Sequence, residues 1–253
     1  MAESDAGLLR LIGFGLAIGA ALVLQRLSPH SRTAGSLRVN GELWVINIIV
    51  MGTLCGACVC SAAQWAASRE MGLLQWSAAP TPVALVVSVL FLDLVSYAWH
   101  RANHVVPFLW RWHRVHHSDP SFTVSTSLRF HPGELILSLP LRILAVVVLG
   151  APVLAVVVFE VVFTLANSIE HGDINLPRRF EAAAQRVFVT PALHRWHHTV
   201  LVPDRDTNFG TIFSVWDRLF GSFSPSDSAT TIRTGVPGVT EVGLRDALAM
   251  PFH

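Results

Sequence analysis

Four long apolar runs dominate the sequence and restrict the folds that the chain can adopt. Each has roughly 20 residues or more and at most two charged side chains, which suits a helix crossing the roughly 30 Å hydrocarbon core of a bilayer. The runs cover residues 7–27, 43–67, 81–99 and 135–166, and no comparable run follows Asn167. The sequence therefore predicts an all-α, polytopic membrane protein.

The last apolar run is long enough for two helices and carries a turn signal at its centre. Gly150, Ala151 and Pro152 form a sequence that is typical of a chain reversal. The run forms either one long kinked span or a hairpin of two short helices, near residues 134–149 and 151–167. We favour the hairpin, because histidines on both sides of the run then reach the same membrane face.

Basic residues indicate on which side of the membrane the histidines lie. Arg26, Arg32 and Arg38 lie around the connection between the first two runs, and the positive-inside rule places that connection in the cytoplasm. The third run then ends at the cytoplasmic face, directly before His100. Since all 18 basic residues are arginine, a composition typical of GC-rich bacterial genomes, we expect a bacterial inner membrane protein.

Composition excludes several other classes of protein. Only 14% of the residues are charged, against about 25% in ordinary soluble domains, which argues against a soluble monomer. The net charge is +1 without a basic stripe, so the sequence predicts no nucleic-acid partner. Cys55, Cys58 and Cys60 all lie in the second run and are interpreted as packing residues.

The placement of the histidines points to metal chemistry. Ten of the twelve lie between His100 and His198, while His30 and His253 are interpreted as ordinary interfacial residues. The groups are HxxxH at His100 and His104, HxxHH at His113, His116 and His117, and HxxHH at His194, His197 and His198. On a helix, each HxxHH offers one pair on a common face and a third imidazole turned by about 100°. Buried neutral imidazoles need partners, and metals such as Zn, Fe, Cu and Ni provide them.

Further motifs accompany the histidine groups between about Asp93 and Gly221. They are Arg129-Phe-His131-Pro132-Gly-Glu134, Glu170-His171-Gly172-Asp-Ile-Asn175, Asp206-Thr-Asn208-Phe-Gly210 and Trp216-Asp217-Arg218-Leu-Phe220-Gly221. In this order and spacing, the set resembles the fatty acid hydroxylase/sterol desaturase superfamily of integral membrane oxygenases. The resemblance implies a non-haem di-iron site on transmembrane helices, with a cytosolic helical cap that carries the histidine boxes.

The resemblance also implies the metal ligands. Carried onto this chain, they are His100, His104, His113, His116, His117, His194, His197 and His198, with His171 as a ninth. Some fatty acid hydroxylases have a further histidine where this chain has Asn167. His131 matches a histidine-proline element of the family and is either a tenth ligand or a supporting residue.

Two residues before the first histidine group are candidates for a supporting role. Asp93 lies seven residues before His100, on nearly the same helix face, and a carboxylate inside a span is usually functional. We predict that Asp93 accepts a hydrogen bond from a ligand histidine, the alternative being a hydrogen bond that only packs helices together, and that Tyr97 has one of these same two roles. Weaker candidates are Glu134, Glu160, Glu170, Asp173, Asp206 and Asn208.

The implied reaction is the O2-dependent hydroxylation or desaturation of a lipid such as a sterol or a fatty-acyl chain. The implied cofactor is a pair of iron ions, which zinc can replace in purified protein, with O2 as co-substrate. Electrons would come from a separate ferredoxin or reductase, since the chain has no CxxCH haem motif and no GxGxxG motif.

Three other functions remain open at this point. A carotenoid-type hydroxylase would use the same chemistry on a longer substrate. A membrane metal carrier would spread its ligands through the spans, whereas here they cluster at helix ends. A zinc hydrolase would keep three ligands and a nearby glutamate base, and the chain has no HExxH motif.

The chain is accordingly divided into three parts. Residues 1–80 form N-terminal transmembrane helices, residues 81–223 form the hydroxylase-like domain with its metal site on the cytoplasmic side, and residues 224–253 form a C-terminal tail.

Overall fold

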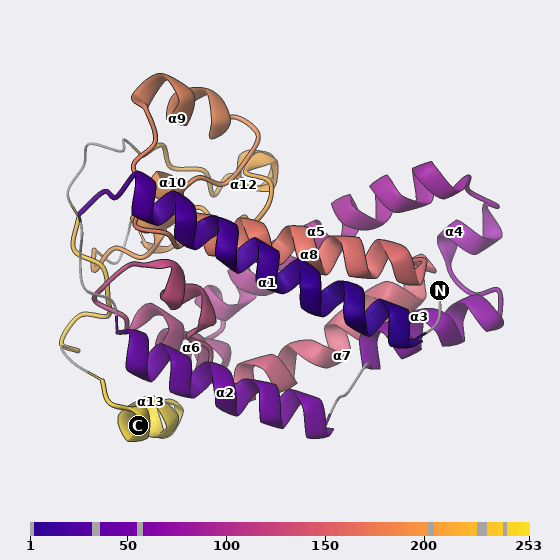
Figure 1. Ribbon diagram of the computed structural model, residues 1–253, viewed down its shortest axis with the longest axis horizontal. Helices are drawn as coiled ribbons and strands as arrows, with labels where there is room; N and C mark the ends of the chain where they lie inside the picture. The colour runs from indigo at the N-terminus through magenta and orange to yellow at the C-terminus, as the bar shows by residue number, and fades with distance from the viewer. Residues whose placement is uncertain (1–2, 32–35, 55–57, 202–204, 227–231, 240–241) are drawn as a thin grey trace.

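The computed structural model is a bundle of helices with a cap of short helices at one end (Figure 1). It describes residues 3–31, 36–54, 58–201, 205–226, 232–239 and 242–253. Arg32 and Cys55 of the sequence analysis lie outside this part of the chain. Among the described residues there are isolated β-bridges but no strand, so the predicted all-α class is confirmed.

Long apolar helices form the body of the molecule. They are α1 (Glu3–Leu27), α2 (Leu37–Leu54), α3 (Cys58–Ser68), α5 (Thr81–Val105), α7 (Pro132–Leu149) and α8 (Val153–Glu170), with the short α4 (Leu73–Trp76) before α5. Five segments are long and apolar enough to cross a membrane: Asp5–Leu27, Leu37–Trp76, Thr81–Val105, Pro132–Leu149 and Val153–Glu170, of which the second includes residues 55–57, outside the described part of the chain. The prediction of a polytopic membrane protein is confirmed.

The predicted hairpin in the last apolar run is present. Helix α7 ends where Gly150 adopts a left-handed conformation with φ of 70°, and α8 begins after Pro152. Gly150 is required here because a side chain is strained at positive φ, and an added Cβ would lie 2.6 Å from the carbonyl oxygen of Met71. The turn thus brings both ends of the hairpin to the same face of the bundle.

The second apolar run was expected to form one span over residues 43–67. The structure has α2 and α3 there, on either side of residues 55–57, which lie outside the described part of the chain. The apolar segment extends over 40 residues, Leu37–Trp76, which is about twice what one crossing needs. Both helices pack against α7, so the length is used to cover the hairpin.

Short helices gather at the end of the bundle where α1 and α8 end (Figure 1). They are α6 (Pro107–His117), η1 (Val124–Leu128), α9 (Arg178–Ala184), α10 (Pro191–His197), α12 (Val215–Leu219), α13 (Leu244–Ala249) and η2 (Met250–Phe252). The backbone of Asn175 donates to Ser28 and that of His30 to Asp173, which ties the end of α1 to the segment after α8.

The last ten residues pack against the body of the molecule. Within the segment 224–253, which the sequence analysis assigned to a C-terminal tail, α13 and η2 pack against α6 and α2, where Leu43, Val115 and Ala247 are buried together. Arg114 donates to the carbonyl oxygens of Met250 and His253. The tail therefore covers the outer face of the helix that carries the first HxxHH group.

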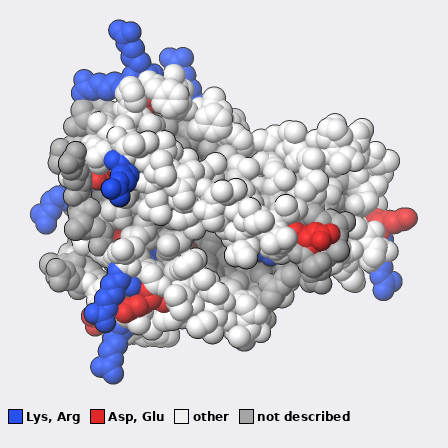
Figure 2. Space-filling model, in the orientation of Figure 1, with Lys and Arg blue, Asp and Glu red and all other residues white. Residues whose placement is uncertain are grey.

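Charge is distributed as expected for a membrane protein. Figure 2 shows arginines and carboxylates at the two ends of this face, with an almost uncharged surface between them. Large apolar side chains of α1 and α2, among them Leu11, Leu16 and Ile49, are more than half exposed. Lipid tails are the solvent that such a band requires.

Candidate metal centre

Nine histidines come together where the cap meets the bundle, and they form two groups. The ligand-capable nitrogens within each group lie within 4.8 Å of one another. The first group contains His100, His104, His113, His117 and His197, and the second contains His116, His171, His194 and His198. These are the nine histidines that the sequence analysis named as ligands.

Helix geometry explains how the HxxHH motifs divide. On α6, His113 and His117 are four residues apart and face the first group, while His116 faces the second. At α10 the pattern is reversed: His194 and His198 belong to the second group, and His197 belongs to the first. Each motif therefore supplies both groups, as the helical spacing predicts.

Backbone carbonyls orient several of the rings. The Nδ1 of His100 lies 2.8 Å from the oxygen of Phe209, and that of His197 lies 2.6 Å from the oxygen of Thr207. His116 and His171 make the same contact with Arg129 and Asn167, at 3.2 and 2.7 Å. Because a carbonyl only accepts, each of these Nδ1 atoms carries the proton, and the unprotonated Nε2 points into the group.

Two carboxylates orient histidines of the first group. The Nδ1 of His113 is 2.8 Å from Glu134, which also accepts from Asn103, and the Nδ1 of His104 is 3.1 Å from Asp206. Carboxylates in this position fix the ring and raise the basicity of the opposite nitrogen. Glu134 and Asp206 were only weak candidates in the sequence, because neither is at helical spacing from its histidine.

The ring nitrogens that point into the two groups have no hydrogen-bond donor beside them among the described residues, apart from contacts with other histidines. The Nε2 atoms of His100, His104, His113 and His197, and both ring nitrogens of His117 and His198, are buried without a hydrogen bond to any described residue. In the second group, the Nε2 of His171 lies 2.9 Å from that of His116 and 2.9 Å from that of His194. With Nδ1 protonated in His116 and His171, two lone pairs face each other, and a cation between them relieves the repulsion.

Burial favours a metal ion over a proton in this role. Desolvation, reinforced mainly by neighbouring histidines, keeps the pKa values well below their usual range for His116, His117, His194 and His198. Desolvation likewise lowers the pKa of His171 to about 4 and that of His197 to about 3. The imidazoles are therefore neutral near pH 7, which is the form that binds a metal.

Asp93 was predicted to accept a hydrogen bond from a ligand histidine, and this prediction is wrong. Its carboxylate accepts from the backbone N–H groups of Ile212 and Phe213, both at 3.2 Å, and from Nε1 of Trp216 at 2.8 Å. It contacts no ligand histidine. The reason is that the segment after residue 206 folds back over this face of α5 and presents three donors to the buried carboxylate.

Tyr97 likewise holds the same segment rather than a histidine. Its hydroxyl lies 2.8 Å from Ser222, which donates to Asp217, and Asp217 accepts from the backbone N–H groups of Phe209 and Gly210. Asp93, Tyr97 and Asp217 thus hold in place a segment whose carbonyls orient His100 and His197. They act on the site through that backbone.

The structure places the remaining candidates as follows. His131 lies outside both histidine groups, since its Nδ1 accepts from Gly133 at the start of α7 and its Nε2 is 3.2 Å from the oxygen of Leu248. Asn208 and Asp173 hold loops, and Glu170 lies buried with Oε1 3.8 Å from both His171 and His194. The structure thus favours the supporting role for His131.

A cavity of about 480 Å³ leads away from the histidines into the bundle. Histidines of both groups line its inner end, namely His100, His113, His116, His171 and His194. Its walls come mainly from α1, α2, α5, α7 and α8 and are largely apolar. The cavity can therefore bring an aliphatic group up to both histidine groups at once.

Comparisons with known proteins agree with this site. An ornithine lipid hydroxylase of Rhizobium tropici is 28% identical over 246 residues, which cover 91% of this chain and 71% of that protein. An alkylglycerol monooxygenase of Danio rerio is 29% identical over 66% of this chain, and a lathosterol oxidase of Rattus norvegicus is 31% identical over 58% of it. The chain spans less than half the length of these two relatives, at 36% and 48%.

No solved structure matches the chain. The sequence model of the fatty acid hydroxylase family matches residues 85–222, more than half of the chain, including all nine histidines of the two groups. The resemblance seen in the sequence is therefore confirmed: the chain belongs to the fatty acid hydroxylase family, within the fatty acid hydroxylase/sterol desaturase superfamily.

Proposed function

We propose that the protein is a membrane-bound oxidoreductase in which the two histidine groups hold two iron ions and a lipid is hydroxylated with O2. The observation that carries the proposal is the pair of groups whose inward nitrogens, among the described residues, have either no hydrogen-bond partner or only another histidine nitrogen. Five imidazoles would serve one ion and four the other, and imidazole is a donor that suits iron. When bound, the ions supply the O2 chemistry that attacks an unactivated C–H bond.

The residues of this chain contribute orientation and exclusion of water. Backbone carbonyls and Glu134 hold ligand rings, so that the Nε2 atoms converge without reorganisation. The apolar cavity between the spans seats an aliphatic chain and keeps bulk water from the site. A substrate carbon at the end of the cavity lined by His100 and His116 would lie beside histidines of both groups.

The lipid substrate is supported by the relatives and by the position of the cavity. The relatives are named for ornithine lipid, alkylglycerol and lathosterol, which all carry aliphatic parts. The cavity is lined by membrane-spanning helices, so a substrate can enter from the bilayer. A metal carrier has less support, because the nine histidines form one compact centre instead of a path across the spans.

We further propose that the centre faces the cytoplasm of a bacterial cell, where Arg26 and Arg38 border the connection between the first two spans. A separate ferredoxin or reductase would then deliver electrons from the cytoplasmic side.

The proposal is tested by expressing the chain with an electron donor and supplying isotopically labelled O2. Lipid mass spectrometry should show one labelled oxygen atom added to a host lipid, and a His197→Ala variant at equal membrane level should show none. Loss of two hydrogens without label would indicate desaturation by the same centre. A lipid profile that is identical with and without the wild-type protein would contradict the proposed activity.

A further inference from the structure

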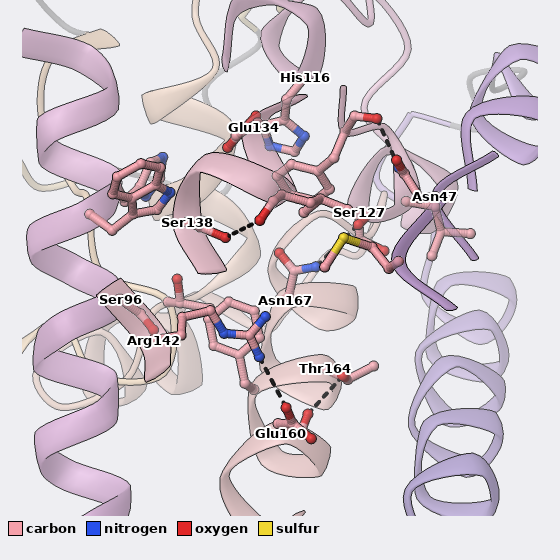
Figure 3. A pocket seen from close by; sticks show the side chains of 18 of the residues that line it. Asn47, Ser96, His116, Ser127, Glu134, Ser138, Arg142, Glu160, Thr164 and Asn167 are labelled. Atoms are coloured by element: carbon pink, nitrogen blue, oxygen red, sulfur yellow. Dashed lines mark hydrogen bonds and ion pairs between the residues drawn. The ribbon is translucent and has the colours of Figure 1, made fainter. Parts of the chain in front are cut away.

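Three charged residues line the cavity at the end remote from the histidines. Glu160 of α8 is 5% exposed; its Oε2 is 2.7 Å from Nε of Arg10 on α1, and its Oε1 is 3.0 Å from Nη2 of Arg142 on α7. Figure 3 shows Arg142 beside Glu160, with His116 and Glu134 farther along the cavity. All three belong to segments that are apolar enough to span the membrane.

The charges of this cluster do not balance. Two guanidinium groups face one carboxylate, which leaves a net charge of +1 among the cavity-lining residues at this end. An uncompensated charge within a membrane-spanning region is expensive, and such residues normally have a partner or a function. The other acidic residues on the cavity wall are Glu134, which pairs with His113, and Glu170, which lies beside His171.

Arg142 has capacity for a further partner. A guanidinium group has five N–H donors, and within the described part of the chain only the contact with Glu160 is recorded for Arg142. Its side chain is 39% exposed and lines the cavity, and that of Arg10 is 27% exposed beside it. A planar fork of donors in an apolar space is suited to a carboxylate or a phosphate.

We infer that this cluster binds the anionic group of an aliphatic substrate, a phosphate or a carboxylate, whose chain extends along the cavity to the histidines. The inference rests on the proposed function and adds a substrate class to it. Glu160 and Glu170 are ten residues apart on α8, which corresponds to about 15 Å along the helix. Oxidation would therefore fall on a carbon at about this distance from the anionic group.

Glu160 has a defined part in this arrangement. By pairing with both arginines it holds α1, α7 and α8 together and reduces the net positive charge of the cluster from +2 to +1. The anion of the substrate would then supply the missing negative charge. Removal of the Glu160 carboxylate should strengthen anion binding, whereas removal of the Arg142 guanidinium should weaken it. If the cluster were purely structural, the two substitutions would not change the affinity for an anion in opposite directions.

The test is equilibrium binding to the purified full-length protein in detergent, without turnover. The probes are a long-chain fatty acid, a lysophosphatidic acid and a fatty alcohol of equal chain length. We expect Arg142→Gln to weaken binding of at least one anionic probe by about tenfold, with Arg142→Lys intermediate, and Glu160→Gln to strengthen it. The alcohol should bind equally to all variants. The matched control is Arg38→Gln, because Arg38 pairs with Glu42 and its side chain is 90% exposed.

The probes separate the two sources of the anion. If the Arg142 and Glu160 substitutions change the affinity for the fatty acid alone, the cluster binds a carboxylate. If they change the affinity for the lysophosphatidic acid alone, it binds a phosphate. Equal affinities in wild type and Arg142→Gln, or a matching loss for the alcohol, would overturn the inference and leave the cluster as a structural tie. Because binding is measured without turnover, this outcome is independent of the labelled-oxygen experiment on the proposed function.

Discussion

The histidines of the two groups differ in the hydrogen-bond partners that orient their imidazole rings. His100 and His197 depend on carbonyls of the segment around residues 207–209, while His113 depends on Glu134. His117 and His198 have no hydrogen-bond partner among the described residues at either nitrogen. Their orientation in the protein therefore depends on packing and on the ions that we propose.

Substitution of one histidine from each group should separate the two metal positions. We predict that His197→Ala and His116→Ala each lower the metal content from about two ions to about one per chain and abolish activity. Each variant removes one buried donor and leaves the other group intact. Metal analysis of variants extracted from membranes checks this.

His253→Ala is the control for that pair of variants, since His253 is exposed and lies outside both groups. It should keep wild-type metal and activity. Full activity in either test variant would refute the assignment of the ligands.

Asp93→Asn should affect stability more than metal binding. The amide keeps one acceptor where the carboxylate accepts three N–H groups, so the free energy of unfolding should fall by about 1–3 kcal/mol. We expect a lower melting temperature in detergent and lower activity, with metal per folded chain unchanged. Asp5→Asn, at an exposed position, is the control, and metal loss without a change in melting would refute this role.

The sequence predicted which histidines would meet, but not what supports them. Spacing of three and four residues on α6 and α10 determines which face each imidazole occupies, and this periodicity is visible in the sequence. The partners of Asp93 are main-chain groups 119 and 120 residues away and one tryptophan, and main-chain donors carry no sequence signal. Such contacts arise only when the chain has folded back.

At the scale of elements, the α7–α8 hairpin determines where the second histidine group lies. His171 follows α8 directly, so the turn at Gly150 decides which face of the bundle receives it. This turn was predictable because Gly-Ala-Pro has a local conformational preference. The contacts that α2 and α3 each make with α7 were not predictable, since packing between helices carries no local sequence signal.

Gly150→Ala should destabilise the hairpin. A residue with a Cβ in the left-handed region costs about 1–2 kcal/mol, and here the Cβ would also lie 2.6 Å from the carbonyl oxygen of Met71. We predict a lower melting temperature and less protein in the membrane. Gly15→Ala lies inside α1 with open space around its Cβ, so it should be neutral or slightly stabilising. Equal melting of both variants would contradict this role.

At the scale of the whole molecule, the short helices gather at the end of the bundle, and two of them, α6 and α10, carry histidines of both groups. The C-terminal helices pack on α6 through residues that the sequence did not distinguish from a tail, because a six-residue helix has a short and ambiguous pattern. Long apolar runs and histidine spacing were therefore predictable, and the closure of the cap by distant segments was not.

The metal-free protein should be sensitive to acid. Burial keeps the pKa of His171 near 4 and that of His197 near 3, below the value of 6.5 in the unfolded chain, so the unfolded state binds more protons below pH 6.5. Stability of the chelator-treated protein should be constant above pH 6.5 and fall as the pH decreases toward 4. Melting temperatures measured across this range in detergent check it, and stability that rises on acidification would contradict it.

The most direct test of the account is the metal content of the wild-type protein, purified in detergent without chelators. The two histidine groups predict close to two ions per chain, with iron as the metal that supports lipid oxidation. Two zinc ions would support the geometry but would require reconstitution with iron before activity is assayed. Well-folded protein that binds far less than one ion per chain, even after incubation with ferrous iron, would contradict the central claim.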